Sequence, residues 1–295
     1  MIEYEEGHFE GIIVMVDFHN IAVRNAFIVV NADPEENRSW IKWRAKMIDT
    51  IIDLVGKFKA KRLIIAVDSA TKKYWRHDVY PEYKANRSMY KKEAKVDFDS
   101  LNSAMDNLID DIKNILPIYV VRIDGSESDD IIAVLTKYHG GSADIVIVSS
   151  DKDFCQLTTK FHGVKQYDLS KRKFIMVPNP IDHIDVKVLT GDRGDGIPPV
   201  KRGIGPKTAQ KYVKSGVNMM ESSDKELVSN YKRNRVLIDF DFIPENVSGD
   251  IRTAYLGITP SELDPMTAYS WVTRNCSESG ELKWQQYSGL FNELI

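Results

Sequence analysis

Four short apolar runs in this chain each end in an acidic residue, a spacing that could bring carboxylates together. The acids are Asp17 after residues 12–16, Asp68 after residues 63–67, Asp124 after residues 118–123 and Asp151 after residues 145–148. A single Asp at such a point is ordinarily explained as a helix cap, because its carboxylate accepts the free N–H groups of the next helix. Capping does not explain a convergence of four. Since the carboxyl ends of parallel strands share one edge of a sheet, we expect these acids to meet there.

More acids lie beside these positions and extend the set. ESDD adds Glu127, Asp129 and Asp130, SSDKDF adds Asp153, and GDRGDG adds Asp192 and Asp195. Carboxylates without Cys or paired His are hard oxygen ligands, which favours Mg²⁺ or Mn²⁺ over zinc. Two such ions about 3.5 to 4 Å apart are the usual arrangement for phosphodiester hydrolysis. We therefore predict a carboxylate site for two divalent ions, although GDRGDG alone would be interpreted as a simple turn.

Basic and aromatic residues alternate in YWRHDVYPEYKANR, residues 74–87. Pro81 is placed to open a helix, whose one face would then carry four cations at three- and four-residue steps. These cations are Lys84, Arg87, Lys91 and Lys95. A salt-bridged surface helix is the ordinary alternative. The interleaved aromatic residues, including Tyr83, favour a nucleic-acid surface, because bases stack on rings while phosphates pair with cations.

A second candidate contact with nucleic acid is GIGPKTAQKYV, residues 203–213. Gly203 and Gly205 fit a tight turn between helices, and Pro206 suits the first position of the second helix. Exposed N–H groups at such a helix start could hold a phosphate. The candidate residues are Lys201, Arg202, Gly203, Gly205, Lys207, Thr208 and Lys211. The alternative is a plain connection between two helices.

The elements that must position these residues follow from the apolar pattern. Val- and Ile-rich runs separated by helix-length segments predict a mainly parallel α/β sheet within residues 1–180. Residues 41–58 have the helical spacing of a segment packed on that sheet. Residues 83–100 are highly charged, which is typical of a solvated helix or a mobile loop. Beyond residue 180 we expect glycine-punctuated helices, and we interpret residues 284–295 as a core-packing helix rather than a docking peptide.

Taken alone, the net charge of −3 argues against a nucleic-acid partner. If nine of the 43 acids belong to one metal site, however, the other 34 face 40 Lys and Arg, which leaves a basic surface. Cys155 and Cys276 fit no zinc spacing. The polar start of the chain and the lack of a ~20-residue apolar run lead us to expect a cytoplasmic monomer that does not bind membranes.

Taken together, these motifs resemble the 5′-nuclease family, which includes flap endonucleases, the 5′-nuclease domain of DNA polymerase I and phage 5′-exonucleases. The resemblance runs through VDFHN, AVDSA, YWRHDVYPEYKANR, ESDDIIAVL, SSDKDF and LTGDRGDGIPPVKRGIGPKTA, about residues 11–215. The stretch VLIDFDFIPENV, residues 236–247, resembles the C-terminal region of a phage member.

The resemblance implies a PIN-like α/β core with a helical arch at about residues 84–104. It also implies a helical domain over residues 181–295, which contains a helix-three-turn-helix at about residues 190–215 and a candidate K⁺ site. Asp17, Asp68, Asp129 and Asp151 would bind the first metal, with Glu127 and Asp130 acting through water. Asp153, Asp192 and Asp195 would bind the second. Lys84 and Arg87 would approach the scissile phosphate.

The leading hypothesis is a structure-selective 5′ to 3′ exonuclease and flap endonuclease that removes RNA primers and 5′ flaps during phage DNA replication. Its partners would be branched or nicked duplex DNA and RNA–DNA hybrids, with a sliding clamp or single-strand-binding protein as a further candidate. One alternative is a haloacid-dehalogenase-like phosphatase, but that class needs an Asp two residues after the first, where this chain has His19. The other is a DNA-junction-binding protein that has lost catalysis.

Overall fold

A central sheet organises the computed structural model, which describes residues 10–87, 94–177 and 179–294. The strands are β1 (Ile12–Asp17), β2 (Ala60–Val67), β3 (Tyr119–Arg122), β4 (Asp144–Val148), β5 (Val164–Asp168) and β6 (Lys173–Ile175). Their order is β3-β2-β1-β4-β5-β6, and only β6 runs antiparallel to its neighbour within the described ranges. The predicted, mainly parallel sheet is confirmed, and β5 and β6 are two strands that the apolar runs did not predict.

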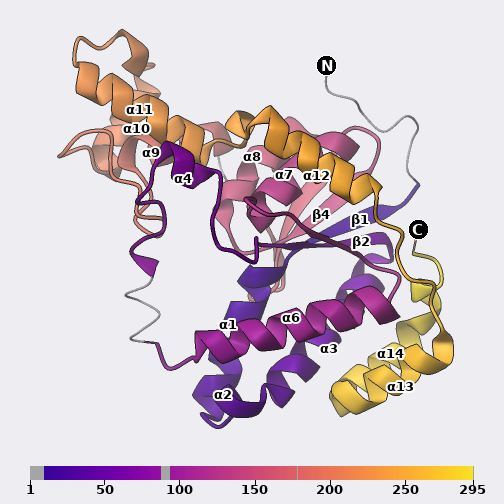
Figure 1. Ribbon diagram of the computed structural model, residues 1–295. Helices are drawn as coiled ribbons and strands as arrows, with labels where there is room; N and C mark the ends of the chain where they lie inside the picture. Colours follow the sequence, from indigo (N-terminus) through magenta and orange to yellow (C-terminus); the bar gives the residue numbers. More distant parts are fainter. Residues whose placement is uncertain (1–9, 88–93, 178, 295) are drawn as a thin grey trace.

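Helices cover both faces of this sheet, which makes a three-layer α/β core (Figure 1). One face carries α1 (Phe18–Ala32), α3 (Ile41–Phe58) and α6 (Phe98–Ile115), and the other carries α7 (Ser128–His139), α8 (Cys155–Lys160) and α12 (Glu245–Leu256). Successive strand residues point to opposite layers, since Val14 belongs to the first apolar cluster and Met15 to the second. The helix predicted over residues 41–58 is confirmed with the same bounds.

The helices after residue 180 pack in two places. α9 (Pro180–Thr190), α10 (Pro206–Lys214) and α11 (Lys225–Ile238) lie together beside α4 (Arg76–Val79), at the upper left of Figure 1. α13 (Pro265–Asn275) and α14 (Glu278–Phe291) instead pack against α3, with Trp284 and Phe291 buried in its cluster. The core-packing role of the C-terminal helix is confirmed, whereas the domain boundary at residue 180 stays a prediction.

Four shorter segments also occur within the described ranges. They are α2 (Glu36–Ser39) and the 3₁₀ turns η1 (Lys152–Phe154), η2 (Met219–Glu221) and η3 (Phe240–Phe242). No helix in the described ranges is long and apolar enough to cross a membrane.

The segment around Pro81 differs from the expected helix. Residues 81–86 form successive turns, and Lys84 adopts the left-handed φ of 58°. Its N–H donates to the carbonyl of Asp195 at 2.8 Å, so a contact with a distant loop replaces the helical hydrogen bond. The prediction that Pro81 opens a helix is therefore wrong.

Only part of the expected arch at residues 84–104 can be compared with the structure. Residues 88–93, and with them Lys91, lie outside the described residues. Residues 98–104 are the first turns of α6, which Asp97 caps by accepting from the N–H groups of Asp99 and Ser100. Leu101 in these turns is fully buried, so the end of the expected arch belongs to the packed core.

Candidate active site

The carboxyl ends of β1 and β2 meet at the start of α7. Ser128 joins them, because its Oγ donates to Asp17 at 3.0 Å and its N–H donates to Asp68 at 2.9 Å. Asp17 also accepts from the N–H of Asn20 at 3.3 Å and therefore caps α1 as well. Asp151 similarly caps η1 through the N–H of Asp153. Asp17 and Asp151 therefore cap helices and also belong to the set of acids at this edge of the sheet.

Electrostatic coupling shows that further acids share this edge. Burial, and then the charge of Asp68, raise the pKa of Asp17 to about 7. Burial followed by the charges of Asp17, Asp151 and Glu127 raises the pKa of Asp129 well above its ordinary value. The neighbouring carboxylates therefore disfavour ionisation of Asp17 and Asp129, and a nearby cation would relieve that repulsion.

Asp68 differs from Asp17 because the groups around it favour its charged form. Burial opposes its ionisation, but the charges of His19 and Lys84 and the Ser128 hydrogen bonds outweigh burial and lower the pKa of Asp68. His19 Nδ1 lies 3.8 Å from a carboxylate oxygen of Asp68 and accepts from its backbone N–H at 3.4 Å. The surroundings of Asp68 thus favour its charged form, in contrast to those of Asp17.

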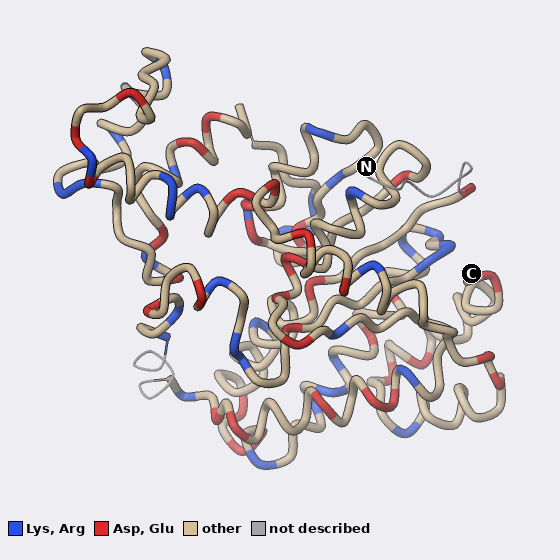
Figure 2. The backbone as a smooth tube through the Cα atoms, turned by 45° about the horizontal axis from the view of Figure 1, so that its top comes forward, with Lys and Arg blue, Asp and Glu red and all other residues tan. Residues whose placement is uncertain are grey.

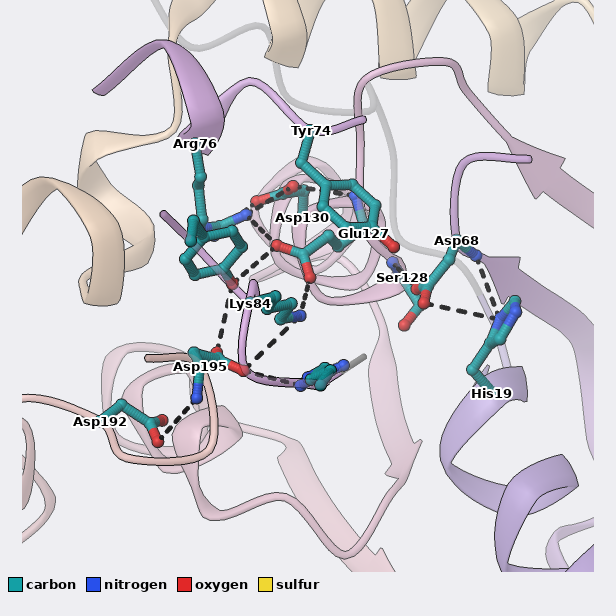
Figure 3. Close-up of polar contacts among 12 residues, drawn as sticks. His19, Asp68, Tyr74, Arg76, Lys84, Glu127, Ser128, Asp130, Asp192 and Asp195 are labelled. Atoms are coloured by element: carbon teal, nitrogen blue, oxygen red, sulfur yellow. Dashed lines mark hydrogen bonds and ion pairs between the residues drawn. The ribbon is translucent and has the colours of Figure 1, made fainter. Parts of the chain in front are cut away.

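Arg76 lies buried behind these acids and holds two more of them (Figure 3). Its guanidinium contacts Glu127 at 2.8 Å and both oxygens of Asp130, at 2.8 and 2.9 Å. Asp130 also accepts from Trp75 Nε1 at 3.1 Å and from the N–H of Glu127 at 3.0 Å, as part of the capping box of α7. Arg76, Trp75 and Glu127 thus hold the Asp130 carboxylate inside the protein, and its role toward the metal through water stays a prediction.

Lys84 and Arg87 converge on Asp195 from the segment after Pro81, and Figure 3 shows Lys84 beside Asp195. Arg87 donates to Asp195 at 2.7 Å, and Lys84 Nζ lies 3.8 Å from the same oxygen while donating to Glu127. Asn86 Nδ2 adds a bond to the carbonyl of Arg193 at 2.8 Å. The segment that carries the two cations is thereby fastened to the 192–197 loop.

The charges in this group reinforce one another. Burial disfavours the Lys84 ammonium, but Glu127 and Asp195 outweigh it and raise the pKa of Lys84. Burial likewise opposes ionisation of Asp195, yet Lys84 and Arg87 lower its pKa. Both groups stay charged at neutral pH.

Tyr83 has a different environment from the one expected. It is 4% exposed, and its hydroxyl donates to Glu127 at 2.9 Å and to Asp195 at 3.2 Å. Its ring cannot stack on a base in this arrangement, so the expected nucleic-acid contact is corrected to a support for the two acids.

Lys187 on α9 contacts both Asp153 and Asp192, and the sequence motifs did not predict this contact. Its Nζ lies 2.6 Å from Asp153 and 2.6 Å from Asp192. Burial alone would lower the pKa of Lys187, but the two carboxylates outweigh it and raise that pKa. Burial raises the pKa of Asp153 to about 6 even with this partner. The only available signal was a lysine five residues before Asp192.

The donor set fits a hard divalent cation, but its oxygens are not arranged as a ready cage. Within residues 10–87, 94–177 and 179–294, no three or more His, Cys, Asp or Glu side chains are placed to hold a metal ion. Four cations hold carboxylates of the predicted set instead: Arg76, Lys84, Arg87 and Lys187. Figure 2 shows several acidic segments near the centre of the molecule, with others spread over its periphery. Which acids bind metal stays a prediction.

The candidate phosphate-binding turn joins α9 to α10. Gly203 has a φ of 91°, Gly205 precedes the helix, and Pro206 is its first residue, as predicted. The exposed Lys207 and Lys211 lie one turn apart on α10. Thr208 is half-buried, Arg202 is exposed, and Lys201 pairs with Asp224 at 2.6 Å. The first helix of the predicted helix-three-turn-helix is α9, which begins at Pro180 and not near residue 190 as expected. A proline fits the first turn of a helix.

Known proteins resemble this chain in sequence and in fold. The family described as 5′-3′ exonuclease, N-terminal resolvase-like domain, matches residues 12–187. Ribonuclease H of Enterobacteria phage T4 is 32% identical over 274 residues, which cover 85% of this chain and 88% of that protein. T5 5′-exonuclease with bound zinc ions has a TM-score of 0.65 at 20% identity, covering 84% of this chain and 99% of that one. A T5 flap endonuclease in complex with DNA and metal ions has a TM-score of 0.65 at 20% identity, covering 83% and 98%.

Proposed function

Because the chain belongs to the 5′-3′ exonuclease family, we propose that it is a metal-dependent nuclease that cleaves phosphodiester bonds at 5′ ends and 5′ flaps. Its task would be the removal of RNA primers and flaps during phage DNA replication. Membership in this family overturns the phosphatase alternative. A non-catalytic junction-binding protein of the same fold is separated from the nuclease by the experiment below.

One observation supports the proposal most strongly. Acids from three strand ends and from the 192–197 loop lie in one site with cations that could bind a phosphate. Asp17 and Asp68 are bridged by Ser128, while Lys84 and Arg87 lie at Asp195. Mutually repelling carboxylates would bind a divalent cation, and basic side chains beside them would bind the phosphate.

The first ion would be held by Asp17, Asp68, Asp129 and Asp151, and the second by Asp153, Asp192 and Asp195. When bound, such ions supply an activated water and neutralise the leaving oxygen. Lys84 and Arg87 would then hold the scissile phosphate, and their positive charge would help most as negative charge builds up on it. Arg76 would keep Glu127 and Asp130 in place without touching the substrate.

The substrate would be branched or nicked duplex DNA or an RNA–DNA hybrid. Support comes from the relatives, since one is called ribonuclease H and another was solved with DNA and metal ions. The α9–α10 turn would hold the duplex backbone through Lys207, Lys211 and the free N–H groups of α10. Mg²⁺ as the physiological metal, K⁺ at this turn and a clamp or single-strand-binding partner are predictions of the same proposal.

The test uses end-labelled flap DNA and an RNA–DNA hybrid, each incubated with wild type and with Asp129→Asn, with Mg²⁺ and with EDTA. We expect Mg²⁺-dependent release of short 5′ products by wild type and none by the variant. Duplex binding by the variant, followed by fluorescence anisotropy, should be unchanged or tighter, because a negative charge near phosphate is lost. Binding without cleavage by wild type would identify the junction-binding alternative instead.

A further inference from the structure

We infer that Lys187 is a resident counter-cation for Asp153 and Asp192 that the second metal ion must displace. The inference rests on the proposed function, because it concerns the ion that these two acids would bind. Lys187 Nζ lies 2.6 Å from a carboxylate oxygen of each. A single ammonium therefore occupies the point between two carboxylates where a shared ion would sit.

The surroundings make this ion pair stronger than an ordinary surface salt bridge. The side chains of Lys187, Asp153 and Asp192 are 20%, 17% and 20% exposed. Water screens such partly buried charges less than exposed ones. Lys187 lies on α9, whereas Asp153 follows β4 and Asp192 begins the loop after α9, so three segments depend on this contact.

The same contact places a cation where the second ion would bind, in a structure whose described residues form no ready metal cage. The carboxylates of Asp153 and Asp192 lie close enough for one ammonium group to contact both, so they need a positive charge between them. Lys187 provides that charge. An incoming divalent ion would satisfy the same oxygens with twice the charge. Since ammonium and ion cannot share that position, the lysine weakens binding of the second ion while keeping its ligands in place.

Two other roles for Lys187 predict different behaviour. A purely structural lysine would stabilise the fold equally with and without metal. A lysine that only organises the acids for the ion would strengthen metal binding, so its removal would weaken it. Displacement alone predicts that removing the ammonium destabilises the metal-free protein and tightens metal binding.

The experiment compares wild type with Lys187→Met and Lys187→Gln, which remove the charge with an apolar or a polar end group. Lys152→Met is the matched control, because Lys152 lies between Asp151 and Asp153 in the chain but its side chain is exposed. Mn²⁺ binding to the full chain is measured from the free Mn²⁺ signal in electron paramagnetic resonance. Thermal unfolding is recorded in EDTA and in saturating Mn²⁺. Neither readout requires nuclease activity.

We expect wild type to bind two Mn²⁺ ions and both Lys187 variants to bind one of them about tenfold more tightly, equivalent to about 1.4 kcal/mol. Their melting temperature should fall in EDTA and recover in Mn²⁺, while Lys152→Met changes little in either measurement. Unchanged or weaker Mn²⁺ binding by the Lys187 variants would overturn the displacement, as would an equal loss of melting temperature in both media. If wild type bound no Mn²⁺, the proposed metal dependence itself would fail.

Discussion

Replacing Asp17 by Asn should make the metal-free protein more stable at neutral pH while abolishing cleavage. Asp17 is 3% exposed, and burial together with Asp68 raises its pKa from 3.8 to about 7. Folding therefore opposes the charge that metal binding would require. An uncharged amide of the same shape removes that conflict and also removes the proposed ligand.

The expected gain follows from the pKa. A folded-state pKa of about 7 instead of 3.8 costs the fold about 4 kcal/mol at pH 7, and about 1 kcal/mol at pH 4.5. The amide gives back about 1 to 2 kcal/mol, because it replaces an acceptor of hydrogen bonds from Asn20, Ser128 and Ser149. We therefore expect Asp17→Asn to be about 2 kcal/mol more stable than wild type at pH 7 and about equal to it at pH 4.5.

The sign of the pH dependence is fixed by proton binding. Between pH 3.8 and 7 the folded protein keeps a proton on Asp17 that the unfolded chain has lost. The contribution of Asp17 to the free energy of unfolding therefore falls as pH rises through this window. The advantage of the variant must grow across the same window.

Urea unfolding in EDTA at pH 4.5, 6 and 7.5, followed by tryptophan fluorescence, measures this difference. Asp195→Asn is the control of opposite sign, because Lys84 and Arg87 outweigh burial and lower the pKa of Asp195, so its charge stabilises the fold above the unfolded pKa. That variant should lose stability at pH 7.5 and lose less as pH falls. The reasoning is refuted if Asp17→Asn is no more stable than wild type at pH 7.5, or if its advantage does not change with pH.

Two further predictions concern the substrate. Lys84→Ala should lower the single-turnover cleavage rate about 10²- to 10³-fold but duplex affinity less than tenfold, because the cation would meet the phosphate most closely in the transition state. The rate is measured in quenched single-turnover assays and the affinity by fluorescence anisotropy, at the same salt and Mg²⁺ concentrations. A loss of rate no larger than the loss of affinity would make Lys84 a binding residue only. Lys207→Ala should weaken every duplex about equally and reduce the slope of log K against log salt by roughly one. The exposed Lys225 on α11 provides the control substitution, and an unchanged slope for Lys207→Ala would count against the α9–α10 turn as a phosphate contact.

The buried parallel strands could be predicted because their signal is local. A strand covered on both faces consists of consecutive apolar residues, and the runs that became β1, β2 and β4 are of this kind. β5 reads VKQYD and lies toward the edge of the sheet, beside β6. Short, partly polar strands of that type have no comparable signature, so both were missed.

The acids of the site could be anticipated by type, but their individual partners could not. Asp129 and Asp130 are adjacent in the sequence, yet successive helix positions face different directions, and the fold turns Asp130 onto Arg76. The pairing of Arg76 with Glu127 joins residues 51 positions apart. Such contacts depend on how α4 and α7 pack, which no local pattern encodes.

The internal cations also explain why net charge was a poor guide to the partner. Lys187 and Arg76 each contact two carboxylates, and Lys84 and Arg87 both lie at Asp195. These five acids and four cations nearly cancel one another, so most of the charge of these acids is balanced inside the protein before any ion or nucleic acid binds. A phosphate-containing ligand would respond to the local field at this edge of the sheet rather than to the sum of −3. Charge totals become informative for such a protein only after the buried pairs have been identified, and identifying those pairs requires the fold.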